Sequence, residues 1–488
     1  MRKITLALAL LFTLQIISCA ADETDSTNIE ENTSEGTAGT VGTDEADEYK
    51  FPDFDYGGGK FVILNTRQEY NFYDALDFDE ATGDSLDDAI YDRNRELEEK
   101  FNFEFEINND YMYQDASTHL QNMVMANDDI YDAAFLRDNW MVSLLTNRMC
   151  MDMQNISGFN FDEPWWDSQA IEDTRFGSSQ AIYYAFCDIS LVDFEGTVVI
   201  FINENMTTEL GLELPYDSVR DGSWTWDELN TLLTAGANLN GDDSFDWDKD
   251  ASAVYGLVGY QHTMDSLIAG AGEDFFVKDE SGVPHLATEG NRFFDVVDKM
   301  INMLTSDGKY LFLNGYTDPM DHYEAAFKNR RALMMTAQIK AANTYRDMED
   351  SYGILPIPKY DESQQSYRCI RSYTYPLSIP VTNAEADSAA VILDAMAYLT
   401  YTDVMDDFYN GRISMKALRN EDSIDMLEII RDSRYYDIGQ AYGWSETIKE
   451  VFRNAVTKGN TEVASGIESV RTSIETSIES VMSMLDGQ

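Results

Sequence analysis

Histidine is scarce in this chain, and the few histidines form no catalytic or metal-binding pattern. The 488 residues include four histidines, and no two of them have the spacing of an H-E-x-x-H zinc site. The G-x-S-x-G turn of a serine nucleophile is missing, as are the glycine-rich loops that bind phosphates or dinucleotides. We therefore expect no cofactor and no metal centre built on histidine.

Basic residues are also few. The chain has 34 lysines and arginines against 89 aspartates and glutamates, which gives a formal net charge of −55. Nucleic acid needs a basic surface that matches its phosphates, so we expect no nucleic-acid partner. A strongly anionic ligand is disfavoured for the same reason. The excess of acid is typical of a solvated, secreted surface.

Cysteine is limited to four residues without the spacing of a metal site. Cys150, Cys187 and Cys369 follow Cys19 in the chain. Three cysteines allow at most one disulfide within the chain, and the sequence leaves open whether one forms.

An acidic segment, residues 238–250, has oxygen-bearing side chains at alternate positions, as calcium loops do. However, Asp243 stands where an EF-hand loop requires glycine, and Lys249 stands where it requires glutamate. A solvated turn is therefore favoured over a calcium site, which stays open.

The amino-terminal residues are typical of an exported lipoprotein. Arg2 and Lys3 precede a mostly apolar run over residues 4–17, which predicts a signal peptide over residues 1–18. Residues 16–19 resemble the bacterial lipobox, which implies acylation of Cys19 and a lipid anchor. An ordinary secretory signal is the alternative. Residues 19–58 are acidic and poor in apolar side chains, which predicts a flexible tether.

Strand-like and helix-like segments alternate after the tether. Three strands are predicted at residues 60–65, 103–107 and 130–136, with helices at 85–101 and 119–125 between them. This order favours an open, mainly parallel α/β sheet. Ligands gather at the carboxyl ends of strands in such sheets. The candidates after the first and third strands are Arg67, Glu69, Arg137, Asp138 and Asn139, although each could equally be a solvated loop residue.

Residues 323–380 contain a characteristic order of elements. A short helix is followed by the apolar runs ALMMT (332–336) and YGILPIP (352–358), then by a strand-like run over 372–380 and a helix over 385–400. This order resembles the extracellular solute-binding proteins of bacterial ABC importers, family 1, the sugar- or maltose-binding type.

The resemblance implies a type II periplasmic-binding-protein-like fold of the α/β class. This fold has two lobes, each a mainly parallel sheet flanked by helices, with a cleft between the lobes. The implied first lobe contains residues 59–190 and 356–403, and the second contains 191–355 and 404–488. Strands at 180–186 and 197–203 would make the first passage between the lobes.

The resemblance also implies ligand-binding residues. Sugars present hydroxyl groups to polar side chains and apolar faces to aromatic rings. Residues 131–136 correspond to a strand whose end supplies such groups, which points to Phe135 beside Arg137 and Asp138. Core packing is the stronger expectation for the Trp165–Trp166 pair, with a sugar platform second. The remaining candidates are Trp166, Asp188, Gln338, Tyr373, Tyr442 and Trp444.

From the resemblance we expect a lipid-anchored, monomeric binding protein on the extracellular face of the cell membrane. Its ligand would be a small solute, a sugar or an oligosaccharide, captured by lobe closure and delivered to ABC permease subunits. A peptide or another polar solute stays open. The alternatives are a secreted glycan-degrading enzyme, for which abundant carboxylates are no evidence by themselves, and a ligand-binding lipoprotein that works without a transporter.

Replacing Cys19 by Ala tests the lipid anchor. The variant should lose the acyl chain, because the thiol of Cys19 is the expected acceptor. Metabolic labelling with a fatty-acid analogue should mark the parent protein and not the variant. Equal labelling of both would contradict the lipobox interpretation.

Overall fold

The computed structural model describes most of the chain that follows the expected tether. The described residues are 49–68, 70–177, 179–315, 321–345, 347–409, 422–459 and 462–485. The expectations for the signal peptide, Cys19 and most of the tether lie outside them.

The first sheet has four strands in the order β12-β3-β1-β2. Strand β1 pairs in parallel with both β2 and β3, whereas β12 runs antiparallel to β3 at the edge. The strands predicted at residues 60–65 and 103–107 are therefore confirmed, and they form a parallel pair. The bounds are β1 Gly59–Asn65, β2 Phe103–Asn108, β3 Ala133–Phe135 and β12 Leu377–Ser378.

Four helices accompany this sheet. Helix α1 starts after Asp84, whose side chain accepts a hydrogen bond from the Leu86 amide at 3.2 Å, and it ends at Asn102, which takes the left-handed conformation. Its apolar stripe is buried, as the periodicity predicted, and it packs on α12. The bounds are α1 Ser85–Phe101, α2 Tyr113–Ala126, α3 Asp138–Thr146 and α12 Ala386–Leu399.

The second sheet has five strands in the order β10-β4-β9-β5-β8. It is mixed rather than mainly parallel, because β4 runs against both of its neighbours, β10 and β9, while β5 pairs in parallel with β9 and β8. Every residue of β4 and β9 is buried, so these strands form the centre of the core. The bounds are β4 Val198–Asn203, β5 Tyr255–Gly259, β8 Tyr310–Phe312, β9 Ala332–Gln338 and β10 Tyr352–Leu355.

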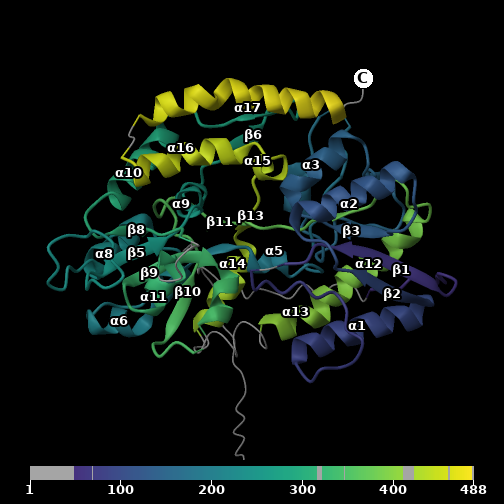
Figure 1. The fold of residues 1–488 in the computed structure, drawn as a ribbon, viewed down its shortest axis with the longest axis horizontal. Coiled ribbons are helices and arrows are strands. Elements are labelled where there is room, and N and C mark those ends of the chain that lie inside the picture. The colour runs from purple at the N-terminus through teal and green to yellow at the C-terminus, as the bar shows by residue number, and fades with distance from the viewer. Residues whose placement is uncertain are drawn as a thin grey trace, which may run out of the picture. The chain divides into compact units, whose positions relative to one another are not determined.

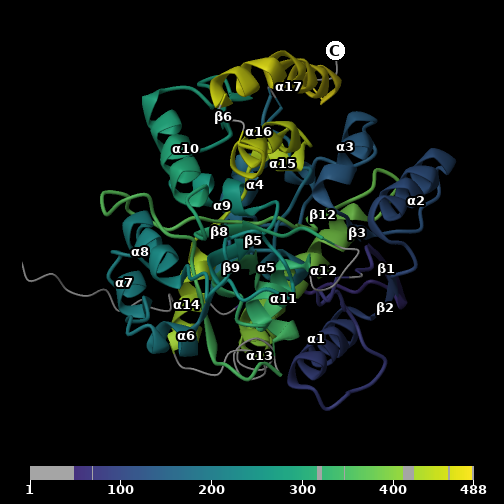
Figure 2. The ribbon, with the colours of Figure 1, turned by 60° about the vertical axis from the view of Figure 1, so that its left-hand side comes forward.

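Helices of different lengths pack around the second sheet. Helix α8 lies against β5 and β9, and α11 lies against the same two strands. The bounds are α6 Glu204–Glu209, α7 Tyr216–Arg220, α8 Trp226–Gly236, α9 Thr263–Gly270, α10 Asn291–Leu304, α11 Tyr323–Lys328 and α14 Asp422–Asp432. In both ribbon views the elements of the first sheet lie together on one side and those of the second sheet on the other (Figure 1, Figure 2).

Two long helices close the chain. Helix α17 packs on α16, on β7 and on α3, and Figure 1 shows it running above elements of both sheets. Their bounds, with those of α15, are α15 Ile438–Ala441, α16 Ser445–Thr457 and α17 Val463–Leu485. Within the described ranges, no helix combines the length and the apolar character that crossing a membrane requires.

Short elements connect the larger ones. Strand β11 pairs in parallel with β13, and β6 pairs with β7 in a hairpin. Their bounds and those of the short helices are η1 Met153–Asn155, α4 Ser168–Thr174, α5 Val192–Glu195, β6 Phe276–Lys278, β7 Pro284–Leu286, η3 Ile339–Thr344, β11 Cys369–Ile370, η4 Thr400–Val404, α13 Met405–Asp407 and β13 Arg434–Tyr435.

The first predicted passage between the lobes differs in part from the structure. Residues 197–203 do contain β4, but residues 180–186 form no named strand and make only an isolated bridge from Ala185 to Leu377. Leu377 belongs to the edge strand β12 and pairs with Phe135 as well, so the bridge from Ala185 extends the first sheet by a single residue pair. The predicted lobe boundaries themselves stay a prediction, since the described residues from Phe51 onward form one compact unit.

The Trp165–Trp166 pair is an anchor of the core, as the stronger of the two expectations had it. The indole N–H groups of both residues donate to Oδ1 of Asp394 on α12, at 3.1 and 2.8 Å. Trp166 is 3% exposed, and the rings of Phe159 and Phe161 pack against it. Each buried indole N–H needs an acceptor, because an unpaired one costs free energy, and Asp394 accepts from both.

Replacing Asp394 by Ala should lower the free energy of unfolding by about 3 kcal/mol, since two buried indole donors lose their acceptor. Urea denaturation followed by circular dichroism measures the change. The matched control is Asp298→Ala on the exposed side of α10, for which we expect a change within about 0.5 kcal/mol. Equal midpoints for the two variants would contradict the role of Asp394.

Candidate functional site

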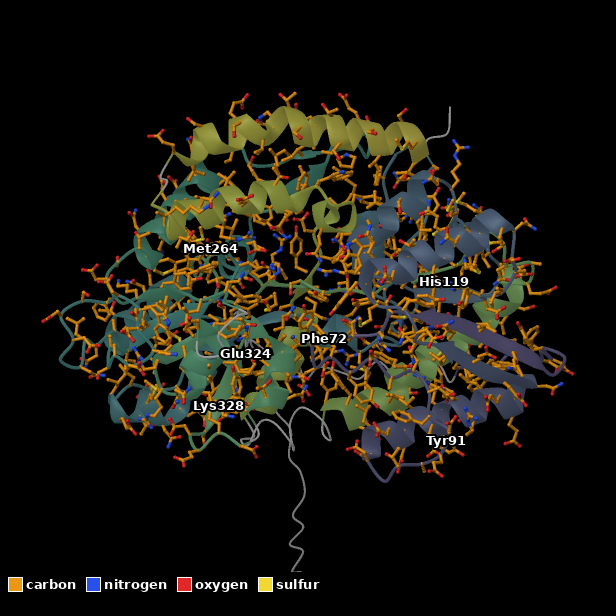
Figure 3. All side chains as sticks on the ribbon, in the orientation of Figure 1. Phe72, Tyr91, His119, Met264, Glu324 and Lys328 are labelled. Atoms are coloured by element: carbon orange, nitrogen blue, oxygen red, sulfur yellow. The ribbon has the colours of Figure 1, made fainter. Side chains whose placement is uncertain are left out.

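A cavity of about 310 Å³ lies beyond the carboxyl ends of β1, β5 and β9. Five segments from both sheets and from the crossing region line it, in agreement with the rule that ligand sites of α/β sheets lie at the ends of the strands. Figure 3 places its residues Phe72 and Glu324 where the elements of the two sheets meet. The lining residues are Tyr70, Asn71, Phe72, Tyr260, Gln261, His262, His322, Tyr323, Glu324, Gln338, Lys340, Ala341, Thr344 and Tyr373.

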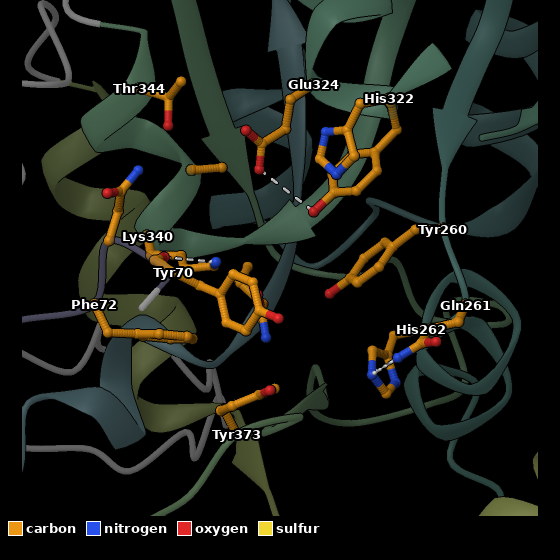
Figure 4. A pocket seen from close by; sticks show the side chains of 14 residues that line it. Tyr70, Phe72, Tyr260, Gln261, His262, His322, Glu324, Lys340, Thr344 and Tyr373 are labelled. Atoms are coloured by element: carbon orange, nitrogen blue, oxygen red, sulfur yellow. Dashed lines mark hydrogen bonds between the residues drawn. The ribbon is translucent and has the colours of Figure 1, made fainter. Parts of the chain in front are cut away.

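Two stacked aromatic pairs form the apolar part of the lining. Phe72 and Tyr373 stack with ring centroids 5.2 Å apart and 27° between the planes. Tyr260 and Tyr323 stack with centroids 4.6 Å apart and 18° between the planes. Figure 4 shows the first pair and Tyr260 on different sides of the cavity. Flat ring faces from two sides suit a ligand with apolar C–H faces.

A lysine and a glutamate supply the charge. The Lys340 ammonium donates to the Tyr70 carbonyl oxygen at 2.8 Å and lies 4.5 Å from the centre of the Phe72 ring (Figure 4). Burial lowers the pKa of Lys340, an effect that Glu324 and Glu195 oppose. Burial raises the pKa of Glu324, an effect that Lys340 opposes. The two groups therefore balance each other's charge in the lining.

Strand β5 of the second sheet ends at Gly259, where the hydroxyl groups of Thr263 and Thr336 lie close to the backbone. A Cβ atom on Gly259 would collide with the hydroxyl groups of Thr263 and Thr336, which bond to each other at 2.6 Å. This contact joins β5, β9 and the start of α9. It fixes the path of Tyr260 and the two residues after it at the edge of the cavity.

Two of the residues proposed from the sequence line the cavity. Tyr373 belongs to one aromatic pair, and the Gln338 amide donates to the Ser372 hydroxyl at 2.9 Å. Arg137 lies beside the cavity rather than in its lining, with its guanidinium 3.8 Å from the centre of the Tyr373 ring. It can orient that ring.

Four further candidates from the first lobe do not reach the cavity. Phe135 is wholly buried in β3, whereas Arg67 and Asn139 are exposed. Asp138 is 1% exposed and accepts hydrogen bonds from three side chains, so its carboxylate is already occupied. Glu69 lies outside the described residues.

The candidates near the expected hinge and the last helices are packed by protein as well. Asp188 forms ion pairs with Arg434 at 3.1 Å and with Arg431 at 3.7 Å. Trp444 is 2% exposed and stacks on Tyr442, whose hydroxyl donates to the Thr174 carbonyl at 3.1 Å. Like Trp166, none of these side chains lines the cavity, and the two rings are buried against their neighbours, which is favourable for large aromatic side chains.

Sequence reasoning missed the aromatic and polar residues at the end of β5. Tyr260, Gln261 and His262 directly follow a short apolar run, and the rule on strand ends applies to the second sheet as it does to the first. That signal could have found them. Lys340 lies in the short turn η3, and no pattern in the sequence distinguishes it from a surface lysine.

The described part of the chain contains no cluster of histidine, cysteine and acidic side chains suited to a metal ion. In the 238–250 segment, Asp242 instead accepts hydrogen bonds from the backbone amides of Ser252 and Ala253. The described cysteines, Cys150, Cys187 and Cys369, are buried and unpaired.

No protein-family model and no curated protein matches this sequence. Solved structures do match. An ABC substrate-binding protein from Listeria monocytogenes in complex with cycloalternan is 12% identical with a TM-score of 0.53, over 86% of this chain and 99% of that one. A cyclo/maltodextrin-binding protein complexed with maltotetraose is 12% identical with a TM-score of 0.56, over 88% of this chain and 98% of that one.

This chain has the two-lobed fold of ABC solute-binding proteins. UgpB from Mycobacterium tuberculosis, in complex with glycerophosphocholine, shares it with 11% identity and a TM-score of 0.54, over 83% of this chain and 98% of that one. The fold class inferred from the sequence is therefore confirmed. The cavity lies where segments of the two lobes meet.

Replacing Lys340 by Met tests the electrostatics of the cavity. Burial is the larger cause that lowers the pKa of His322, and the positive charge of Lys340 lowers it further. Without that charge the protonated ring is less disfavoured, so the pKa of His322 should rise. An NMR titration of the four histidine rings measures it, and His322→Gln assigns the signal.

Lys60→Met, at the exposed start of β1, is the control and should leave the pKa of His322 unchanged. An unaltered His322 titration in the Lys340→Met protein would contradict the described proximity.

Proposed function

We propose that this protein is a solute-binding protein that captures a sugar or an oligosaccharide in the cavity between its lobes. The observation that carries the proposal is the pair of aromatic stacks, Phe72–Tyr373 and Tyr260–Tyr323, combined with amide, hydroxyl and charged groups in one cavity. Rings match the C–H faces of a sugar, and the polar groups match its hydroxyls. The structural neighbours bind cycloalternan and maltotetraose.

Capture works by closure of the lobes. The cavity lining combines residues 70–72, which follow β1 of the first sheet, with residues 260–262 and 322–324 of the second. A ligand that touches both groups gains its full set of contacts only in the closed form, so binding shifts the population toward closure. The hydrogen bond from Lys340 to the Tyr70 carbonyl connects the same two groups.

Binding rather than hydrolysis is the activity that fits the lining. Glycoside hydrolysis generally needs two carboxyl groups on either side of the scissile bond. Among the described lining residues, Glu324 alone carries a carboxyl group, and Lys340 opposes its charge. The released ligand would therefore be chemically unchanged.

The protein would act at a membrane surface. The lipobox-like sequence that ends at Cys19 supports a lipid anchor on the extracellular face, and the polar, acidic segment after it supports a tether of considerable reach. The fold supports delivery of the ligand by a monomer to ABC permease subunits, which would use ATP to move it across the membrane. Cleavage at Cys19 leaves 32 basic against 89 acidic residues, a net charge near −57.

Replacing Tyr373 or Tyr260 by Leu should weaken saccharide binding about tenfold, because leucine keeps the apolar volume and removes the flat face. Isothermal titration calorimetry with maltotetraose and cycloalternan measures the affinity of each variant. Tyr91→Leu on α1, outside the cavity, is the matched control and should bind as the parent does. Thermal unfolding of each variant checks that the fold is intact.

If the parent protein binds neither saccharide and a thermal-shift screen of further mono- and oligosaccharides gives no response, the proposed ligand class is wrong. Equal affinities of the parent and both cavity variants would contradict the location of the site.

A further inference from the structure

Two neighbouring residues of the cavity belong to a chain of polar contacts that runs into the core. Gln261 and His262 follow β5 and line the cavity. Nδ1 of His262 lies 3.0 Å from Oδ2 of Asp265, and Nε2 of His262 lies 3.2 Å from the amide nitrogen of Gln261 (Figure 4). Behind Asp265, the Lys449 ammonium lies 3.5 Å from the same Oδ2.

The residues that follow Gln261 in this series of polar contacts are deeply buried. Asp265 is 1% exposed, Lys449 is 5% exposed and His262 is 8% exposed. Burial alone would raise the pKa of Asp265, but the electrostatic effects of His262 and Lys449 and the hydrogen bond from His262 outweigh it and hold the pKa below its ordinary value. Asp265 is therefore an ionised carboxylate at neutral pH, and it can only accept hydrogen bonds.

The direction of every hydrogen bond in the chain follows from that carboxylate. Nδ1 of His262 must carry the proton, so in the neutral ring Nε2 has a lone pair. The Gln261 amide nitrogen then donates one N–H to Nε2. The other N–H and the carbonyl oxygen of Gln261 are not used by His262.

We propose that Gln261 recognises hydroxyl groups of the ligand, and that His262, Asp265 and Lys449 are positioning residues that set the direction of its carboxamide. This inference rests on the proposed function and goes further, because it specifies the hydrogen-bonding pattern of the ligand. With neutral His262, Gln261 offers one donor and one acceptor side by side. Two adjacent hydroxyl groups, one accepting and one donating, match that pair.

Protonation of His262 changes the pattern. A charged imidazolium carries N–H on both nitrogens, so Nε2 can no longer accept from Gln261. The carboxamide of Gln261 then rotates by about 180° so that its oxygen accepts a hydrogen bond from Nε2–H. This leaves two N–H donors for the ligand and no acceptor. A ligand hydroxyl that donated to Gln261 then loses its partner, so the protonated form should bind the ligand more weakly than the neutral form.

Groups from several elements surround His262 and must be considered with it. Tyr260, next to it, packs edge-on against its ring, and Tyr323 and His322 lie behind Tyr260 at the start of α11. Tyr310 on β8 approaches Asp265, and Lys449 on α16 lies between Asp265 and Asp437. His322 is the other histidine in the lining of the cavity, so the experiment must separate the two histidines.

The first measurement needs no ligand. Nitrogen-15 NMR of histidine-labelled protein at pH 7.5 reports which ring nitrogen carries the proton, and His262→Gln assigns the signal among four histidines. We expect the Nδ1–H form for His262 and a rise of the Nε2–H form in Asp265→Asn, whose amide no longer enforces the tautomer. A dominant Nε2–H form in the parent protein, or an unchanged tautomer of His262 in Asp265→Asn, would overturn the assigned directions of these hydrogen bonds.

The second measurement is the affinity for maltotetraose between pH 5.5 and 8 by calorimetry. At a pH at which the NMR spectrum shows a protonated His262 ring, the parent should bind about fivefold more weakly, as one hydrogen bond is lost. His262→Gln should abolish this dependence, Gln261→Ala should weaken binding at every pH, and His322→Gln should keep most of the dependence. His285→Gln, exposed on β7 and outside the cavity, should behave as the parent does.

Identical pH profiles for the parent and His262→Gln would overturn the role of Gln261 in recognition while leaving the proposed function intact. If the parent protein binds no saccharide at any pH, the proposed function fails, and the recognition of hydroxyl groups by Gln261 fails with it. The NMR measurement still decides the directions of the hydrogen bonds between Gln261, His262 and Asp265 in that case, so the two failures are distinguishable.

Discussion

A carboxylate almost wholly removed from water joins three distant segments of the chain, and the arrangement around the cavity depends on it. Asp138, the first residue of α3, is 1% exposed. Its Oδ2 accepts hydrogen bonds from the Thr374 hydroxyl at 2.7 Å, the Tyr436 hydroxyl at 2.7 Å and the Gln440 amide at 3.0 Å. A buried charge is tolerated only when it is fully hydrogen-bonded, so α3, the segment before β12 and the segment around α15 must keep these positions together.

More buried charges surround this point. Arg371 pairs with Asp167, Arg434 pairs with Asp188 at 3.1 Å, and the Tyr375 amide donates to Asp193 at 2.6 Å. Burial raises the pKa of Asp193 to about 7 despite the nearby arginines. Such pairs add little net stability, because desolvation offsets their attraction. Their effect is to specify which segment lies against which at the crossing between the lobes, a few residues from Tyr373 in the cavity.

The spacing of apolar residues along the chain accounts for the elements that could be predicted from the sequence. Apolar stripes predict helices such as α1 and α17, and a continuous apolar run predicts β9, so the order of the elements could be predicted. The two-lobed fold was implied by the resemblance that this order carries. The side chains of the cavity could be predicted only in part. Tyr373 and Gln338 lie near conspicuous strands, but in a chain with 12% aromatic residues a ring such as that of Trp444 gives no sign of whether protein or ligand covers it.

Long-range pairing accounts for the remaining differences. From the sequence, Asp188 was expected to accept hydrogen bonds from a ligand. In the structure Arg434, which is far away in the sequence, donates to its carboxylate. The same holds for Lys340, whose partner is a backbone carbonyl of the opposite lobe. Contacts between residues hundreds of positions apart leave no local pattern, and ligand sites between lobes are built almost entirely from such contacts.

Helix α17 packs against α3 on one side and β7 on the other, and this has a mechanical consequence. A motion that separated α3 from β7 would therefore have to break one of these two contacts. A motion that opens the cavity on the side away from α17 would keep both of them, so the helix restricts the directions in which the proposed binding protein can open.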